Sequence, residues 1–471
     1  MYDPKSLNAA GFISHEEICE SMAYARANCR DRQLIMSVIA KAEAAKGLSH
    51  REAALLLECQ LPDANEKIFA LAKELKLRFY GRRIVMFAPL YLSNYCVNGC
   101  TYCPYHAKNK EICRRKLSQD DIKREVIALQ DMGHKRLALE TGEHPVMSPV
   151  EYVLESIKTI YSIHHKNGAI RRVNVNIAAT TVENYRKLKD AGIGTYILFQ
   201  ETYHKENYER LHPTGPKSDY AWHTEAMDRA MQGGIDDVGC GVLFGLSEHL
   251  YDFIGLLMHA EHLEAVFGVG PHTVSVPRIR RADDIDPGDF PNAVDDDTFA
   301  KIVAVLRVAV PYTGMIVSTR ESPDVRARVL ELGVSQISGG SRTSVGGYAD
   351  GGEEEDSSQF EVSDTRTLDQ VVNWLLEKGF IPSFCTACYR EGRTGDRFMQ
   401  LVKSGQIANC CQPNALMTLK EYLEDYASPD TAAKGEKLIA EELERITNPK
   451  VREIAASYLQ ALHDGKRDFR F

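Results

Sequence analysis

The sequence predicts an α/β protein built on a closed (β/α)8 barrel of the TIM type, with a helical N-terminal segment and a mainly helical C-terminal domain. Helical periodicity without β-rich runs covers residues 15–80, and short β-rich runs alternate with amphipathic helices from 83 to 340. Helical stretches rich in Glu and Lys follow. Eight βα units over roughly 260 residues match a closed parallel barrel, whose active site lies at the carboxyl ends of its strands.

The eight predicted strands are short and rich in Val, Ile, Leu and aromatic residues, as strands buried on both faces are. Each is followed by a stretch with helical periodicity, so the strands are expected to run parallel. In order they are RIVMFAPLYL (83–92), RLALE, VNVNIAA, YILFQ, DVGCGVLF, HTVSVP, MIVST and QISGG.

Four segments are expected along the chain. Residues 1–80 form the helical N-terminal segment and 81–345 form the barrel. Residues 346–380 contain a mobile acidic loop and a connecting helix, because the stretch GGYADGGEEEDSSQ (346–359) has little apolar surface to bury. Residues 381–471 form the C-terminal domain, which carries a second group of cysteines.

Composition narrows the class of function. The formal charge is -9 and no block of Lys or Arg stands out, which argues against sequence-independent binding to nucleic acid and favours a small-molecule substrate. The N-terminus lacks an export signal and no run approaches the roughly 20 apolar residues of a membrane span, so a cytoplasmic protein is expected. Twelve cysteines in such a chain favour metal or redox chemistry over disulfides.

The first cysteine group, CVNGCTYC, directly follows the first predicted strand and so lies at the catalytic rim. Cys96, Cys100 and Cys103 can hold three irons of a [4Fe-4S] cluster and leave the fourth iron open. A zinc site is the alternative, but zinc takes four ligands and only His106 lies near in sequence. The CxxxCxxC spacing, with Tyr102 before the last cysteine, resembles the signature of the radical S-adenosylmethionine (SAM) superfamily. That resemblance implies that SAM chelates the open iron.

Other residues match the positions at which that superfamily binds SAM. In LALETGEHP, Glu143 matches the acidic residue that receives the SAM amine. GVLFGLSE (241–248), with Gly241 and Gly245, resembles the glycine-containing element beside the adenine. Asn174, Asn176, Gln200 and Glu201 also sit near strand ends, where ordinary helix caps or turns are the alternative. Of these four residues, Glu201 and Asn176 are our preferred candidates for contact with the cofactor.

The second cysteine group contains Cys385, Cys388 and the vicinal pair Cys410 and Cys411. No histidine or further cysteine follows at a spacing that would complete a zinc knuckle. A second iron-sulfur cluster with one non-protein ligand is therefore the preferred interpretation.

Across the barrel and tail the chain resembles the HydG family, the radical SAM tyrosine lyases that mature [FeFe]-hydrogenase. The C-terminal signature of that family is C-x2-C-x22-C, which Cys385, Cys388 and Cys411 match, while Cys410 falls one residue short. The segments FQETYH, RLHPTGPKSDY and FGVGPHTVSVPRIR resemble the wider group that includes 2-iminoacetate synthase of thiamine biosynthesis and biotin synthase.

The resemblance implies a two-site reaction. L-Tyrosine would be cleaved at the rim to p-cresol and dehydroglycine, and the fragment would pass through the barrel. At the auxiliary cluster it would yield carbon monoxide and cyanide on an additional iron, giving an Fe(CO)2(CN) unit for assembly of the hydrogenase H-cluster. The implied partners are a low-potential electron donor of the ferredoxin or flavodoxin type and other hydrogenase maturation proteins.

Two further sets of residues are candidates for this reaction. MIVSTRES ends the seventh strand with Ser318, Thr319 and Arg320, and a guanidinium there can pair with the tyrosine carboxylate, although a surface salt bridge is the alternative. The additional iron needs a ligand from the opposite face of the barrel. We expect His262 first and His272 second, although a lone histidine is more often a buried structural group.

Two other functions remain open at this stage. The nearer alternative is a 2-iminoacetate synthase of thiazole biosynthesis. The resemblance implies that such an enzyme has no second cluster, so Cys385, Cys388 and Cys411 argue against it. A non-catalytic iron-sulfur scaffold or electron carrier is the alternative from another class. Formation of 5'-deoxyadenosine on reduction separates an enzyme from a carrier.

Overall fold

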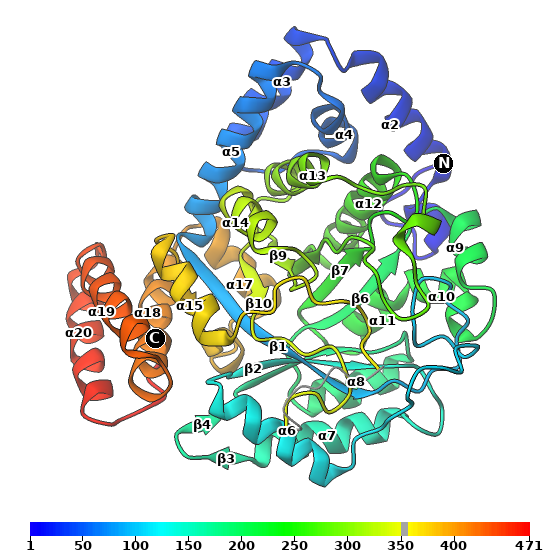
Figure 1. Ribbon diagram of the computed structural model, residues 1–471. Coiled ribbons are helices and arrows are strands. Elements are labelled where there is room, and N and C mark those ends of the chain that lie inside the picture. Colours follow the sequence, from blue (N-terminus) through cyan, green and yellow to red (C-terminus); the bar gives the residue numbers. More distant parts are fainter. Residues whose placement is uncertain (350–356) are drawn as a thin grey trace.

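The computed structural model describes residues 1–349 and 357–471, and its centre is a closed barrel of eight parallel strands. Strands follow one another around the barrel in chain order, and the last pairs with the first through Val85 and Gln336. The predicted (β/α)8 fold is confirmed, and Figure 1 shows the helices around the strands. The strands are β1 (Arg83–Ser93), β2 (Arg136–Thr141), β5 (Arg172–Asn176), β6 (Tyr196–Glu201), β7 (Val238–Val242), β8 (Thr273–Ser275), β9 (Gly314–Val317) and β10 (Gln336–Ser338).

Helices cover the outside of the barrel and close its rim. Because these helices cover the outer face, the strands are buried on both faces, and all residues of β7, β8, β9 and β10 are buried. A two-stranded hairpin, β3 (His164–His165) and β4 (Gly168–Ala169), lies between α7 and β5. The helices of the barrel are α6 (Gln119–Asp131), α7 (Val150–Ser162), α8 (Val182–Asp190), α9 (Lys205–Leu211), η1 (Pro216–Ser218), α10 (Tyr220–Thr224), α11 (Ala226–Gln232), α12 (His249–Phe267), η2 (Pro287–Asp289), α13 (Asp296–Ala309) and α14 (Pro323–Leu332).

The N-terminal helices stand as a layer against one side of the barrel, at the top of Figure 1. Helix α4 packs on α12 and α13, and its buried His50 lies 2.8 Å from Glu261 of α12 and 3.1 Å from Glu17 of α2. These contacts fix the layer to the outer helices of the barrel. The helices are α1 (Ala9–Phe12), α2 (His15–Asn28), α3 (Arg32–Glu43), α4 (His50–Glu58) and α5 (Pro62–Tyr80).

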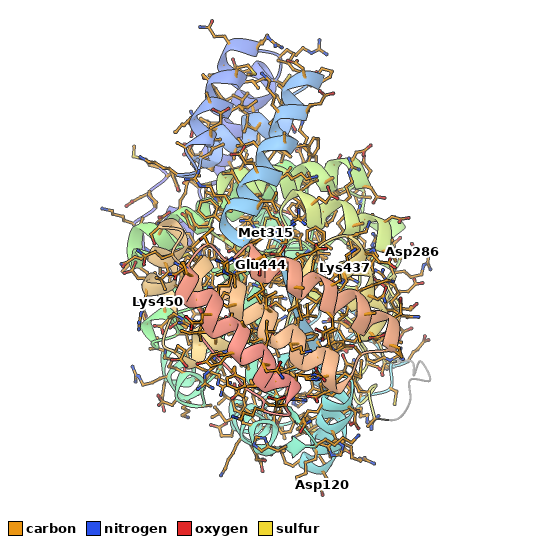
Figure 2. The ribbon with its side chains drawn as sticks, turned by 90° about the vertical axis from the view of Figure 1, so that its left-hand side faces the viewer. Asp120, Asp286, Met315, Lys437, Glu444 and Lys450 are labelled. Carbon is orange, nitrogen blue, oxygen red and sulfur yellow. The ribbon has the colours of Figure 1, made fainter. Side chains whose placement is uncertain are left out.

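The C-terminal region is helical, as predicted, and lies at the amino end of the barrel strands. Its first strand, β11 (Ile381–Ser383), pairs in parallel with Arg83–Val85, before the pairing of β1 with β2 begins at Ala88. Figure 2 shows α18, α19 and α20 side by side across this face. The helices are α15 (Leu368–Glu377), α16 (Ala387–Arg390), α17 (Gly395–Lys403), α18 (Ala408–Asp425), α19 (Pro429–Glu444) and α20 (Pro449–His463).

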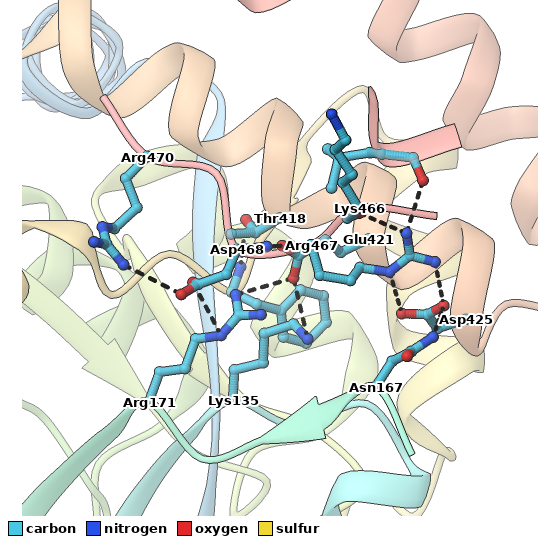
Figure 3. Close-up of polar contacts among 12 residues, drawn as sticks. Lys135, Asn167, Arg171, Thr418, Glu421, Asp425, Lys466, Arg467, Asp468 and Arg470 are labelled. Carbon is cyan, nitrogen blue, oxygen red and sulfur yellow. Dashed lines mark hydrogen bonds and ion pairs between the residues drawn. The ribbon is translucent and has the colours of Figure 1, made fainter. Parts of the chain in front are cut away.

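A buried group of charges joins α18 to the start of the barrel strands (Figure 3). The carboxylate of Glu421 lies 3.2 Å from Lys135 and 2.9 Å from Arg171, and Arg171 lies 3.3 Å from Asp468. Glu421 and Lys135 are almost completely buried. An unpaired charge is costly in such a place, so the network fixes the position of α18 against the barrel.

Within the described residues, no helix is long and apolar enough to cross a membrane. Residues 350–356 of the acidic loop expected to be mobile lie outside the described residues.

Candidate active site and second cysteine cavity

Cys96, Cys100 and Cys103 follow β1 and line one cavity at the carboxyl rim of the barrel. Backbone hydrogen bonds hold their loop: Val97 N donates to the carbonyl of Glu143 at 2.8 Å and Gly99 N donates to that of Thr214 at 2.9 Å. A Cβ atom on Gly99 would lie 2.3 Å from the Thr214 hydroxyl, so a larger residue there would displace that side chain.

Burial gives these thiols a specific chemical character. It raises the pKa of Cys103 to about 12, with the neighbouring Cys96 thiol acting in the same direction, and it raises the pKa of Cys100 too. A nucleophilic cysteine needs a lowered pKa, whereas a metal displaces the thiol proton when it binds. The raised pKa values therefore argue against a nucleophilic role for Cys100 and Cys103.

Within residues 1–349 and 357–471, no three His, Cys, Asp or Glu side chains are grouped so that they could hold one metal ion. In an iron-sulfur cube each thiolate would bind a different iron.

A partly buried ion pair lies in the same cavity. Lys217 Nζ is 2.8 Å from Glu201 Oε1, and both side chains line the cavity. Burial alone would lower the pKa of Lys217, but Glu201 together with the Cys100 and Cys103 thiols raises it, so the ammonium stays charged. Glu201 has a φ of 67° next to a shift in the register of β6 and β7. Such a conformation in a residue other than glycine is found mainly at functional sites.

Glu143, Asn176 and Tyr102 also line the rim cavity. Asn98 Nδ2 donates to Glu143 Oε2 at 2.6 Å, and burial raises the pKa of Glu143. The Tyr102 hydroxyl lies 2.7 Å from Nε2 of His212. Burial, with Lys217 nearby, lowers the pKa of His212 to about 3, so this imidazole is neutral.

Gly241 and Gly245 are not among the residues that line the cavity. A Cβ atom on Gly241 would lie 2.5 Å from the ring of Phe199, and one on Gly245 would lie 2.7 Å from Ile279. Gly245 also has a φ of 114°. Gly241 therefore packs against Phe199, which lines the cavity, whereas Gly245 packs against Ile279, which does not.

A second cavity occupies the barrel interior below the rim. Ser318, Thr319 and Arg320 line it, and Arg320 also lines the rim cavity. The guanidinium of Arg320 lies 3.7 Å from the ring centre of Phe360, on the segment after the acidic loop. The residues shared by the two cavities form a common wall, and they are Tyr91, Glu140, Asn176, Phe199, Arg320 and Gln359.

A third cavity lies at the amino end of the barrel and contains Cys385, Cys388 and Cys411. Cys410 does not line it, and its sulfur lies 3.6 Å from Arg393 Nη1. Burial raises the pKa of Cys388 to about 11, with the Cys385 thiol acting in the same direction. The raised pKa therefore argues against a nucleophilic role for Cys388, as it does for Cys103.

The third cavity is one layer below the interior cavity. Val85 and Arg136 line the third cavity, and Phe87 and Ala138, two residues further along the same strands, line the interior one. The three cavities are thus stacked along the barrel axis.

His272 lines the cavity of the second cysteines, whereas His262 does not. The two nitrogens of His262 lie 2.8 Å from the carbonyl of Pro4 and 2.8 Å from Asp228, and its ring stacks on Phe12 at 3.8 Å. The structure therefore places His272, the second choice, and not His262, the first choice, in the cavity of the second cysteines. His262 lies where α12 packs on the N-terminal layer.

Sequence reasoning missed several residues of these cavities. Lys217 lies in the segment RLHPTGPKSDY, where no spacing or motif marks it as a residue of the site. Glu140 is the next-to-last residue of β2, three residues before Glu143. Tyr389 follows Cys388, and its ring centre lies 3.5 Å from the guanidinium of Arg172. A charged residue at the end of a buried strand was the available signal for Glu140.

The barrel and the three-cysteine rim define a radical SAM enzyme. Residues 90–257 match the Radical SAM superfamily, and residues 275–381 match the Biotin and Thiamin Synthesis associated domain. The chain is 32% identical to 2-iminoacetate synthase of Salmonella typhimurium over 71% of its own length and 86% of that protein.

Two solved structures show which family within the radical SAM superfamily the chain resembles. A crystal structure of HydG, a maturase of the [FeFe]-hydrogenase, is 53% identical, with a TM-score of 0.94, covering 98% of this chain and 100% of that one. The maturase HydG from Carboxydothermus hydrogenoformans is 38% identical, with a TM-score of 0.82, covering 96% and 99%. The chain belongs to the HydG family of radical SAM maturases. This confirms the resemblance drawn from its motifs.

Proposed function

We propose that the protein is a radical SAM lyase that cleaves L-tyrosine to p-cresol and dehydroglycine and converts the fragment to carbon monoxide and cyanide. The observation that carries the proposal is the stack of three cavities along one barrel, with three cysteines at each end. A lyase with one site would need only the first set. Coverage of 98% of the chain by a HydG structure, against 71% by 2-iminoacetate synthase, also favours this function.

At the rim, Cys96, Cys100 and Cys103 would hold a [4Fe-4S] cluster, and SAM would bind beside them. When bound and reduced, these groups supply a 5'-deoxyadenosyl radical that takes a hydrogen atom from the substrate amine. The chain's own residues position the cofactor. Glu143, oriented by Asn98, would accept the SAM amine, and the Glu201–Lys217 pair would contact its polar groups.

Arg320 would bind the carboxylate of the amino acid. Its position in the wall between the rim and interior cavities supports this role, because a substrate held there reaches the rim and leaves its product facing the barrel interior. Ser318 and Thr319 would line the path of that product. The closed barrel excludes water from a reactive imine.

At the amino end, Cys385, Cys388 and Cys411 would hold the auxiliary cluster. An additional iron, here part of the product, would take His272 as a protein ligand and leave as an Fe(CO)2(CN) unit for H-cluster assembly. The place of His272 in the same cavity supports this choice over His262. We also propose a ferredoxin or flavodoxin type of electron donor, delivery to other maturation proteins and a cytoplasmic location.

Division of the chain into a helical segment (1–80), a barrel (81–345), a connecting region (346–380) and a cluster domain (381–471) belongs to the same proposal. Each end of the barrel would then have its own cysteine-bearing part.

The test is anaerobic reconstitution with iron and sulfide, followed by EPR with and without SAM. Two cluster signals, only one of them altered by SAM, together with p-cresol and carbon monoxide from L-tyrosine, are expected. A single cluster with p-cresol alone would instead favour an enzyme of the 2-iminoacetate synthase type.

A further inference from the structure

Glu140 lies where the proposed substrate must pass. It is the next-to-last residue of β2, and in the strand register it pairs with Tyr91 of β1 and Asn176 of β5. All three side chains belong to the wall shared by the rim and interior cavities, together with Arg320. Glu140 therefore faces the same space as the candidate carboxylate anchor.

Glu140 also differs from the other acids of this space. Among the described residues that line the two cavities, the acidic side chains are Glu140, Glu143 and Glu201. Glu143 and Glu201 line only the rim cavity, and Glu201 is paired with Lys217. Among the described acidic side chains, Glu140 is the one that lines both cavities, as Arg320 does, and it has no ion pair within 4 Å. It is therefore the acid placed to meet a cation on a substrate that Arg320 holds.

An α-amino acid brings such a cation. Its carboxylate and ammonium groups are joined to one carbon, so a guanidinium that binds the carboxylate fixes the ammonium a few ångströms away. We propose that Glu140 binds the ammonium group of the amino-acid substrate and takes one proton from it. This inference rests on the proposed function and assigns the recognition of the amine in that same site.

The proton transfer has a chemical purpose. The substrate nitrogen enters as an ammonium and must lose a hydrogen atom as an amine. A proton moves from the ammonium nitrogen to a carboxylate oxygen of Glu140, giving a neutral amine and a neutral acid, and no electron is transferred. Burial raises the pKa of Glu140 to about 8, while Asn176 and Arg320 act in the opposite direction. A base works best when its pKa lies near the working pH.

Binding of three related ligands to the reconstituted protein with SAM tests the assignment. L-Tyrosine carries both charges, 3-(4-hydroxyphenyl)propanoic acid lacks the amine, and tyramine lacks the carboxylate. Glu140→Gln is expected to weaken the binding of L-tyrosine and of tyramine about tenfold or more. The affinity for the amine-free acid should change by less than about threefold. Arg320→Ala is expected to weaken L-tyrosine and the amine-free acid but not tyramine.

Asp252→Asn is the matched control, because Asp252 is a buried acid whose pKa burial raises to about 7, and it lies outside both cavities. It should leave all three affinities unchanged. If Glu140→Gln lost affinity equally for L-tyrosine and for the amine-free acid, the proposal would be overturned. Glu140 would then contact the phenol ring or shape the cavity, and would not bind the ammonium group. Unchanged affinities would overturn it too. Wild-type protein that binds no L-tyrosine would instead overturn the proposed substrate.

The proton transfer has its own readout. If Glu140 is the base, p-cresol formation by Glu140→Gln should require a higher pH than in wild type, because solvent must then remove the ammonium proton. Glu140→Asp should restore part of the wild-type profile. An unchanged pH profile in Glu140→Gln would show that another group takes the proton.

Discussion

Lys217 and Glu201 form an ion pair of 2.8 Å inside the rim cavity, beside the three cysteines of the first group. Each charge compensates the other where little solvent reaches it. Glu201 reaches it from a backbone conformation with a φ of 67°. The pair gives the cavity a fixed polar wall next to the proposed cluster.

Replacement of Lys217 by Met is expected to weaken SAM binding roughly tenfold, because Glu201 loses its buried partner and no longer keeps its position. Equilibrium binding of SAM to reconstituted protein measures the effect. Lys187→Met, which removes an exposed ammonium on α8, serves as the control. Wild-type affinity in Lys217→Met would show that the pair is remote from the cofactor.

Arg320→Ala is expected to raise the apparent KM for L-tyrosine about tenfold or more, because a buried guanidinium binds a carboxylate strongly. Uncoupled SAM cleavage should remain measurable, since Arg320 acts on the substrate. Release of p-cresol and 5'-deoxyadenosine from the same samples separates the two effects. Arg328→Ala removes an exposed guanidinium on α14 and is the control. An unchanged affinity for L-tyrosine would exclude Arg320 as the anchor.

Glu421→Gln is expected to lower the free energy of unfolding by about 3 kcal/mol, because Lys135 and Arg171 would stay buried without the carboxylate that pairs with them. Denaturant unfolding of the metal-free protein measures it. Glu377→Gln breaks an exposed pair with Lys434 and should cost less than about 0.5 kcal/mol. Equal stabilities of the two variants would mean that the network does not hold α18 to the barrel.

The barrel and the spacing of the cysteines could be predicted because both are local patterns. Alternating β-rich and amphipathic runs specify βα units, and CVNGCTYC needs no knowledge of distant residues. Partners across the fold could not be predicted in this way. Lys217 meets Glu201 only because the chain returns to the rim after β6, and periodicity carries no signal for such a return.

The choice between His262 and His272 shows the same limit. Both histidines lie near strand β8 in sequence, but α12 turns His262 toward Phe12 of the N-terminal layer, while His272 faces the C-terminal cysteines. Which face of a helix or strand meets a remote segment depends on the tertiary arrangement. Spacing along the chain therefore gives no basis for ranking them.

His272→Ala is expected to lower the iron content of the reconstituted protein and carbon monoxide production, because the additional iron would lose its ligand. p-Cresol formation should persist. His262→Ala should reduce stability by about 2 kcal/mol, since its two buried hydrogen bonds are lost, without a selective loss of iron. Iron analysis and thermal unfolding of both variants check this. Loss of iron in His262→Ala alone would reverse the assignment.

The most direct test of the two-site account compares Cys96→Ser with Cys385→Ser in one anaerobic assay of p-cresol and carbon monoxide. Cys96→Ser is expected to abolish both products, because the rim cluster would lose one of its three ligands. Cys385→Ser should keep p-cresol and lose carbon monoxide, and Cys410→Ser should behave like wild type. Full carbon monoxide production by Cys385→Ser would contradict the account, because the second cysteine cavity would then have no part in the reaction.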